Sequence, residues 1–211
     1  GVGNKFGPIS DPFINAEAKK IFEAELNVSS DARVNSAERT GQGVRVTYSE
    51  KGEQKAAEFA CLLAATGRRS NLDELNLKEA GVTLNERGMP AFNEATGQIE
   101  DKPLFIAGDV SNAHPLLHEA ADDGRIAGEN AGSYPVIHAR PRRAPLSVVF
   151  TDPQIALVGA RFSDLDNSTT SFAVGQVSFE DQGRSRVIGK NKGILRVYGE
   201  QGTGVFLGAE M

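Results

Sequence analysis

The sequence has a single cysteine, Cys61, among its 211 residues, and it has no tryptophan. One cysteine cannot form a disulfide within the chain, and it cannot supply the dithiol pair that thiol–disulfide exchange requires. Cys61 lies in the apolar run FACLLAATG. We therefore expect a small buried residue in a strand rather than a reactive thiol, which needs an exposed electropositive setting. The scarcity of cysteine also favours a reducing, cytoplasmic compartment.

Long hydrophobic runs and excess positive charge are absent as well. No stretch approaches the roughly 20 apolar residues of a membrane-spanning helix, and the opening GVGNKFGPIS lacks the pattern of a signal peptide. The net charge of −5 argues against nucleic acid as the main partner. Arg140, Arg142 and Arg143 in HARPRRAP are the local exception, and we interpret them as a solvated linker rather than a binding patch. The composition predicts an ordinary globular protein with no membrane or nucleic-acid partner.

Two kinds of motif are also missing. No cluster of histidine and cysteine has the spacing of a zinc site, so we predict no metal. No Gly-x-Gly-x-x-Gly follows a strand, because the glycine pairs at 1–3 and 202–204 lack a third glycine at the required spacing. His114 and His138 are expected in loops, and Asp122-Asp123 is expected on a solvated helix face.

The first third of the chain contains clear local patterns. Ser10-Asp11-Pro12 is typical of a helix start, and apolar residues at helical spacing predict a helix over 11–26. Alternation predicts strands near 44–48 and 55–59, joined by a turn at Lys51-Gly52. The continuous apolar run at 61–65 predicts a buried strand.

The rest of the chain suggests two further units. After Gly67 we expect a short helix over 71–80, a pair of short strands within 82–92 and a buried strand over 104–107. A helix over 115–131 should bury a face of small residues: Ala120, Ala121, Gly124, Ala127, Gly128 and Ala131. Strands of an antiparallel α+β unit are expected at 146–150, 155–158, 172–179 and 194–198, and FLGAEM reads as a further strand. Both chain ends suggest a piece of a longer protein.

The strongest functional signal is LFIAGDVSNAHPLLH at 104–118. A strand ending in Gly108-Asp109 would present a carboxylate at the carboxyl edge of a sheet, where α/β proteins bind ligands. That carboxylate could accept hydrogen bonds from the hydroxyls of a polyol. A helix that begins near Pro115 would add backbone N–H groups and a positive dipole end. Local chemistry leaves a plain Gly-Asp turn and an ordinary helix start equally open.

Six stretches together resemble one enzyme family in order and spacing. They are LLAATGRRSN (62–71), AGVTLNERG (80–88), LFIAGDV (104–110), PLLHEAADDG (115–124), APLSVVFTDPQIALVG (144–159) and QGRSR (182–186). The sequence resembles the class I pyridine nucleotide-disulfide oxidoreductases, and within them the dihydrolipoamide dehydrogenase branch, over essentially its whole length. The implied fold is α/β, an incomplete Rossmann-like FAD/NAD(P)-binding part, followed by the start of an α+β dimerisation domain. The implied domains are the remainder of an NAD-binding domain (1–66), the second segment of an FAD-binding domain (67–140) and a partial dimerisation domain (141–211).

The resemblance also implies cofactor contacts. Asp109, next to Gly108, would bind the ribitol side of FAD. Gly67 and Val34 would approach NAD, although Ser70 stands where the family usually has proline and loosens that turn. The backbone that would line the isoalloxazine ring belongs to Pro115, Leu116, Leu117 and His118.

The whole enzyme implied by the resemblance would oxidise dihydrolipoamide-type dithiols with NAD through FAD and a redox disulfide. Its partners would be a lipoamide-bearing protein or small disulfide substrate, and a second copy bound through the C-terminal domain. These 211 residues contain no Cys-x4-Cys pair, and the family's C-terminal His–Glu pair would lie after Met211. We therefore predict no catalytic residue here, and an inactive chain with weak or no FAD binding. Open alternatives are a glutathione- or mercuric-reductase-like protein, a soluble transhydrogenase, or a non-catalytic dimerisation module.

Overall fold

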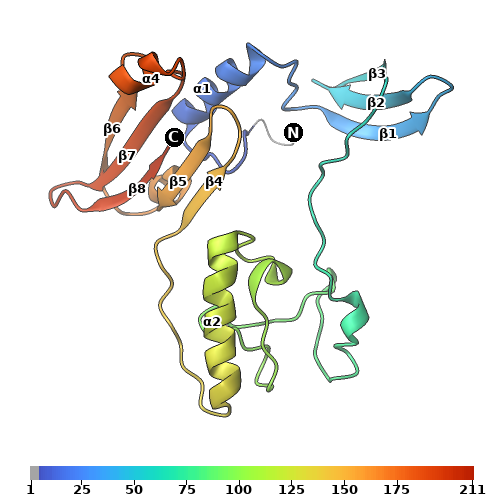
Figure 1. Cartoon of the computed structure of the whole chain (residues 1–211), viewed down its shortest axis with the longest axis vertical. Coiled ribbons are helices and arrows are strands. Elements are labelled where there is room, and N and C mark those ends of the chain that lie inside the picture. The colour runs from blue at the N-terminus through green and yellow to red at the C-terminus, as the bar shows by residue number, and fades with distance from the viewer. Residues whose placement is uncertain (1–4) are drawn as a thin grey trace. The chain divides into compact units, whose positions relative to one another are not determined.

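The computed structural model describes residues 5–211, which form two compact units (Figure 1). The first unit combines the chain up to Ala64 with Ala144–Met211, and the second unit is Ala65–Arg143. The second unit is thus an insertion between two parts of the first. Among the described residues, no helix is both long and apolar enough to cross a bilayer.

The first unit contains a three-stranded antiparallel sheet. Its strands are β1 (Arg33–Arg39), β2 (Val44–Glu50) and β3 (Glu53–Phe59), in that order. Lys51 and Gly52 form the β2–β3 turn with φ angles of 52° and 82°. The prediction of β2 and β3 from alternation is confirmed. Alternation did not predict β1, whose sequence RVNSAER is largely polar and which is held by its pairing with β2.

The same unit also contains a five-stranded antiparallel sheet, which confirms the predicted α+β unit. The sheet order is β4-β5-β8-β7-β6, so the last strand in sequence lies at the centre. Helices α3 (Phe162–Asp166) and α4 (Gly183–Val187) join its strands. The strands are β4 (Leu146–Val149), β5 (Ile155–Gly159), β6 (Phe172–Ser178), β7 (Ile194–Glu200) and β8 (Phe206–Glu210).

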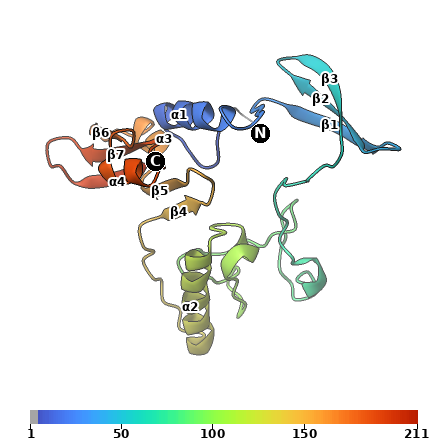
Figure 2. The same cartoon turned by 45° about the horizontal axis from the view of Figure 1, so that its top comes forward.

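Helix α1 (Pro12–Glu23) packs against this sheet (Figure 1, Figure 2). The predicted helix over 11–26 is confirmed with an earlier end, since Leu26 is exposed and follows the last turn. Asp11 caps the helix, because its side chain accepts the backbone N–H of Phe13 at 2.8 Å. The shared apolar core consists of Ile9, Ile14, Ala18, Ile155 and Leu157.

A buried polar network joins the start of α1 to β7 and β8. The Asp11 carboxylate accepts hydrogen bonds from Arg196 Nη1 at 2.6 and 2.7 Å and from the Tyr198 hydroxyl at 2.9 Å. Burial, with the hydrogen bond to Asp11, raises the pKa of the Tyr198 phenol far above its usual range. Glu210 on β8 accepts the backbone N–H groups of Ser10 and Phe162 at 2.8 and 3.0 Å. The network therefore fixes α1 through hydrogen bonds as well as apolar contact.

Gly208→Ala is expected to destabilise the protein by about 1–3 kcal/mol. A methyl group at Gly208 would lie 2.1 Å from the carbonyl oxygen of Ala160, a backbone atom that cannot move alone. Urea unfolding followed by circular dichroism would measure the loss. Gly175→Ala on β6 is the control, because a Cβ there meets nothing within 4 Å. Equal losses at the two positions would contradict the packing argument.

The second unit is built from turns, short bridges and one long helix, α2 (Leu117–Ser133). The helix predicted over 115–131 is confirmed. Two 3₁₀ helices accompany it, η1 (Asp73–Leu75) and η2 (Gly108–Ser111). The apolar core of the unit contains Leu72, Val82, Ile99 and Ile106.

Three predicted elements of this unit are wrong. The helix predicted over 71–80 is only η1 followed by turns, and the strands predicted within 82–92 amount to two isolated bridges, Leu84 with Pro90 and Phe92 with Ile99. The strand predicted over 104–107 makes one bridge, Gln98 to Phe105. Ile106 is buried as expected, but no neighbouring strand is long enough to extend the ladder.

The expectation for Cys61 is also wrong. Cys61 is exposed, and the run at 61–65 is not a strand. Leu62 and Leu63 are exposed by 49% and 88%. A strand needs a paired neighbour to satisfy its backbone groups, and no described residue pairs with this run.

The small residues of α2 do not all lie inward as predicted. Of that set only Ala127 is buried, while Ala121, Gly124, Gly128 and Ala131 are exposed. The helix instead buries larger and polar side chains: Glu119, Asp123, Ile126, Ala127 and Asn130. The inner face of α2 is therefore partly polar, and this bears directly on the site.

Candidate functional site

The Gly108–Asp109 turn lies directly against the first turn of α2. Gly108 is buried with φ of 73°, a conformation that favours glycine. A Cβ at this position would lie 3.2 Å from Cβ of Ala120. Glycine thus allows η2 and the start of α2 to approach closely. The sequence predicts that this turn and this helix start contribute to one site.

Asp109 presents a partly exposed carboxylate beside this turn. Its side chain is 39% exposed, and Oδ2 lies 3.1 Å from Nη1 of Arg68. Arg68 directly follows Gly67, whose φ of 106° turns the chain at this point. Because Arg68 is 80% exposed, the pair is weak, and a hydroxyl-bearing ligand could displace the guanidinium at low cost.

The N-terminus of α2 is open to solvent. Leu116 is the N-cap residue in extended conformation, and no side chain caps the helix. Leu117 is 89% exposed, and His118 Nε2 lies 3.7 Å from Oε1 of Glu119. A positively polarised helix end beside an accessible carboxylate suits a ligand that carries both hydroxyls and an electron-accepting ring. The residues present therefore fit FAD.

The structure brings together most of the residues that the sequence predicted. Gly108, Asp109 and residues 115–118 gather around the start of α2, and Gly67 joins them through its neighbour Arg68. Val34 lies on β1 of the first unit, with a side chain that is 60% exposed. His114 and His138 lie in loops, as predicted.

Sequence reasoning missed a strap of arginines along α2. Residues 138–143, which we call the strap, run back along the helix towards its N-terminus. Arg140 pairs with Glu129 at 3.0 Å, Arg142 with Glu119 at 2.9 Å and Arg143 with Asp122 at 2.7 Å. The interpretation of this segment as a solvated linker holds for Arg140 and Arg143, which are exposed, and is wrong for Arg142, whose side chain is only 21% exposed and pairs with buried carboxylates.

Asp123 lies at the centre of this arrangement, and the expectation that it is solvated is wrong. It is 6% exposed and accepts a hydrogen bond from Arg142 Nη2. Its other oxygen, Oδ2, accepts the backbone N–H of Gly108 at 3.1 Å. Burial acts to lower the pKa of Arg142, but the hydrogen bond and attraction from Asp123 raise that pKa above its ordinary value. The available sequence signal was a group of arginines that follows a helix with several acidic residues. That pattern does not specify which arginine pairs with which carboxylate.

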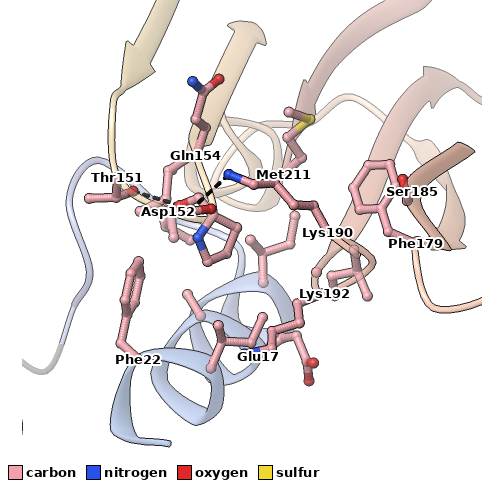
Figure 3. Close-up of a pocket in the computed structure, with 18 residues that line it drawn as sticks. Glu17, Phe22, Thr151, Asp152, Gln154, Phe179, Ser185, Lys190, Lys192 and Met211 are labelled. Atoms are coloured by element: carbon pink, nitrogen blue, oxygen red, sulfur yellow. Dashed lines mark hydrogen bonds and ion pairs between the residues drawn. The ribbon is translucent and has the colours of Figure 1, made fainter. Parts of the chain in front are cut away.

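A hollow of about 400 Å³ lies in the first unit beside α1 (Figure 3). Apolar side chains, among them Phe22 and Phe179, form much of its wall. Its lysines are already paired, Lys190 with Asp152 at 2.9 Å and Lys192 with Glu25 at 2.7 Å. Throughout residues 5–211, no cluster of three or more potential metal-binding side chains occurs. The charged ends of both lysines are thus engaged, and none of the predicted cofactor-binding residues lines the hollow.

Two family models match the chain. Residues 3–124 match the model described as "Pyridine nucleotide-disulphide oxidoreductase". Residues 146–211 match the one described as "Pyridine nucleotide-disulphide oxidoreductase, dimerisation domain". The candidate site at 108–118 falls within the first match.

Curated relatives include several enzymes called dihydrolipoyl dehydrogenase. The enzyme from Geobacillus stearothermophilus is 28% identical over 193 residues, which cover 92% of this chain and 40% of the relative. The enzyme from Halobacterium salinarum is 32% identical over 174 residues, which cover 82% and 36%. The chain thus spans well under half the length of these relatives.

Solved structures with a similar fold include two bacterial proteins. The HOCl-induced flavoprotein disulfide reductase RclA from Escherichia coli matches with a TM-score of 0.81 at 22% identity, covering 99% of this chain and 48% of that one. LpdA from Mycobacterium tuberculosis matches with a TM-score of 0.79 at 24% identity, covering 98% and 45%. At these identities the likeness concerns the fold.

Proposed function

Since the chain belongs to the pyridine nucleotide-disulphide oxidoreductase family, we propose that it supplies part of the flavin site of an enzyme that oxidises dihydrolipoamide-type dithiols with NAD. Members of this family bind FAD and a pyridine nucleotide. The fold expectation, α/β followed by an α+β dimerisation domain, is confirmed by the two family matches. The dithiol substrate follows the names of the curated relatives, and NAD is the nucleotide that the sequence resemblance implies.

The contact between the Gly108–Asp109 turn and the start of α2 carries the proposal. The Asp109 carboxylate would accept hydrogen bonds from ribitol hydroxyls, which is why an acceptor rather than a cation is needed there. The backbone of residues 115–118 would lie along the ring, with the helix dipole favouring negative charge on it. FAD would supply the two-electron chemistry, while these residues bind and orient it.

The remaining roles complete the proposal. Gly67 and Val34 would approach NAD. The domain limits would be 1–66, 67–140 and 141–211, and the last part would pair two subunits, as the description of its family model suggests. A lipoamide-bearing protein is the proposed partner. A cytoplasmic location is included because a single cysteine fits a reducing compartment.

The full-length protein should purify with bound FAD, and NADH should bleach the flavin absorbance under anaerobic conditions. Dihydrolipoamide should then support NAD reduction, while glutathione disulfide and mercuric ion should not be turned over. A full-length protein that takes up no FAD on reconstitution would refute the flavin role. Turnover of one of the other substrates instead would keep the flavin role and replace the dithiol assignment.

Two further measurements test subunit pairing and FAD retention separately. Light scattering of the full-length protein should give a dimer, and a clean monomer would count against subunit pairing. The 211-residue chain alone should lose added FAD on desalting. Intense flavin absorbance that survives desalting of this chain would overturn the expectation that it holds only part of the site.

A further inference from the structure

We propose that Arg142 is a positioning residue of the flavin site, which acts through Asp123 on the Gly108–Asp109 turn and through Glu119 on the first turn of α2. The inference rests on the proposed function, because it takes FAD as the ligand beside Asp109. Arg142 lies outside the turn and outside the helix start, so it acts on the cofactor only through the residues that it holds.

The argument starts from two buried carboxylates. Glu119 and Asp123 are four residues apart on α2, so they share one face of the helix. Their residues are exposed by only 8% and 6%. Two buried negative charges on one helix face repel each other and lose hydration, so they require a cation between them.

Arg142 supplies that cation with the right shape. Its Nη1 donates to Oε2 of Glu119 at 2.9 Å, and its Nη2 donates to Oδ1 of Asp123. A guanidinium can reach two carboxylates at once because its donors lie in a fixed planar fork, which the single ammonium of lysine does not reproduce. Arg142 is therefore matched to this pair by geometry as well as by charge.

The contact extends to the flavin-binding turn. While Oδ1 of Asp123 faces Arg142, Oδ2 accepts the backbone N–H of Gly108, the residue before Asp109. On the other side, Glu119 Oε1 lies 3.7 Å from His118 Nε2 in the first turn of α2. One guanidinium thus holds both carboxylates that touch the two halves of the proposed site.

The strap keeps Arg142 in place independently of the cofactor. Asn130, 1% exposed, accepts the backbone N–H of His138 at 2.8 Å and donates to its carbonyl oxygen at 3.1 Å. Arg143, next in sequence, pairs with Asp122, whereas the backbone N–H of Gly108 donates to Asp123. Arg143 has a 72% exposed side chain and serves as a matched control.

Arg142→Met in the full-length protein is expected to weaken FAD binding at least about tenfold, whereas Arg143→Met should change it less than about twofold. Without the guanidinium, Asp123 no longer fixes the position of the Gly108 backbone. The unpaired carboxylates of Glu119 and Asp123 also add negative charge near the start of α2. The midpoint potential of bound flavin should therefore become more negative. Titration of the apoprotein with FAD and spectroelectrochemistry of the holoprotein measure these two effects.

Lysine at each position gives a milder comparison that keeps the charge. Arg142→Lys should recover part of the affinity and potential, and it should still bind FAD more weakly than Arg143→Lys. This pair decides the question if Arg142→Met does not fold. Equal FAD affinity and potential in the two lysine variants would overturn the inference. A wild-type protein that binds no FAD would instead refute the proposed function itself.

Discussion

Asp109→Ala in the full-length protein is expected to weaken FAD binding by roughly 100-fold. A hydrogen bond to a charged group contributes about 1.5–3 kcal/mol, and every 1.4 kcal/mol is a factor of about ten in affinity. Asp109 would bond to hydroxyl groups that become buried with the cofactor, so we expect a value near the upper end. Fluorescence titration of the apoprotein with FAD measures the change directly.

Two control variants show whether the loss of FAD affinity is specific to the Asp109 carboxylate. Asp101→Ala removes an exposed aspartate from the same unit and should leave FAD affinity within about twofold. Arg68→Ala removes the present partner of Asp109 and should leave FAD affinity unchanged or slightly higher. An Asp109→Ala protein that binds FAD as tightly as wild type would remove this residue from the site.

Arg196→Met should lower the free energy of unfolding by about 3–5 kcal/mol. Arg196 is 13% exposed, and its partner Asp11 is fully buried, so the substitution leaves a carboxylate without its cation. Arg196 also lies 4.7 Å from the centre of the Phe13 ring. Urea unfolding followed by circular dichroism gives the free-energy change.

The control for this prediction is Arg186→Met. Arg186 makes a 3.5 Å pair with Asp181, and both side chains are largely exposed, so the loss should stay below about 1 kcal/mol. Asp11→Asn combined with Arg196→Met should regain part of the stability, because no unpaired charge remains. Similar losses for Arg196→Met and Arg186→Met would show that burial does not decide the strength of these pairs.

The elements that could be predicted from the sequence have local signals. The cap at Asp11 with helical apolar spacing predicted α1, and alternation predicted β2 and β3. The runs at 61–65 and 104–107 were misread for one physical reason. An apolar run indicates that its side chains can be buried. A strand also needs a neighbouring strand to pair its backbone groups, and the sequence of the run does not show whether such a neighbour exists.

The residues of the candidate site also differ in whether a local sequence signal predicts them. Gly108 and Asp109 are adjacent to each other and close in sequence to Leu117, so a local motif could place them together. Arg142 reaches Asp123 from the linker that follows the helix. The residues next to Arg142 in the sequence give no signal that its side chain pairs with a buried carboxylate. Its role depends on the path of the chain after α2, which only the three-dimensional structure shows.

The insertion of the second unit into the first affects how the chain folds during synthesis. Ile14 and Ala18 of α1 emerge from the ribosome well before Ile155 and Leu157, with which they form a core. In the meantime the complete second unit, with its own core around Val82 and its long helix, can fold first. The apolar side of α1 must therefore stay in contact with water or a chaperone until β5 has been synthesised.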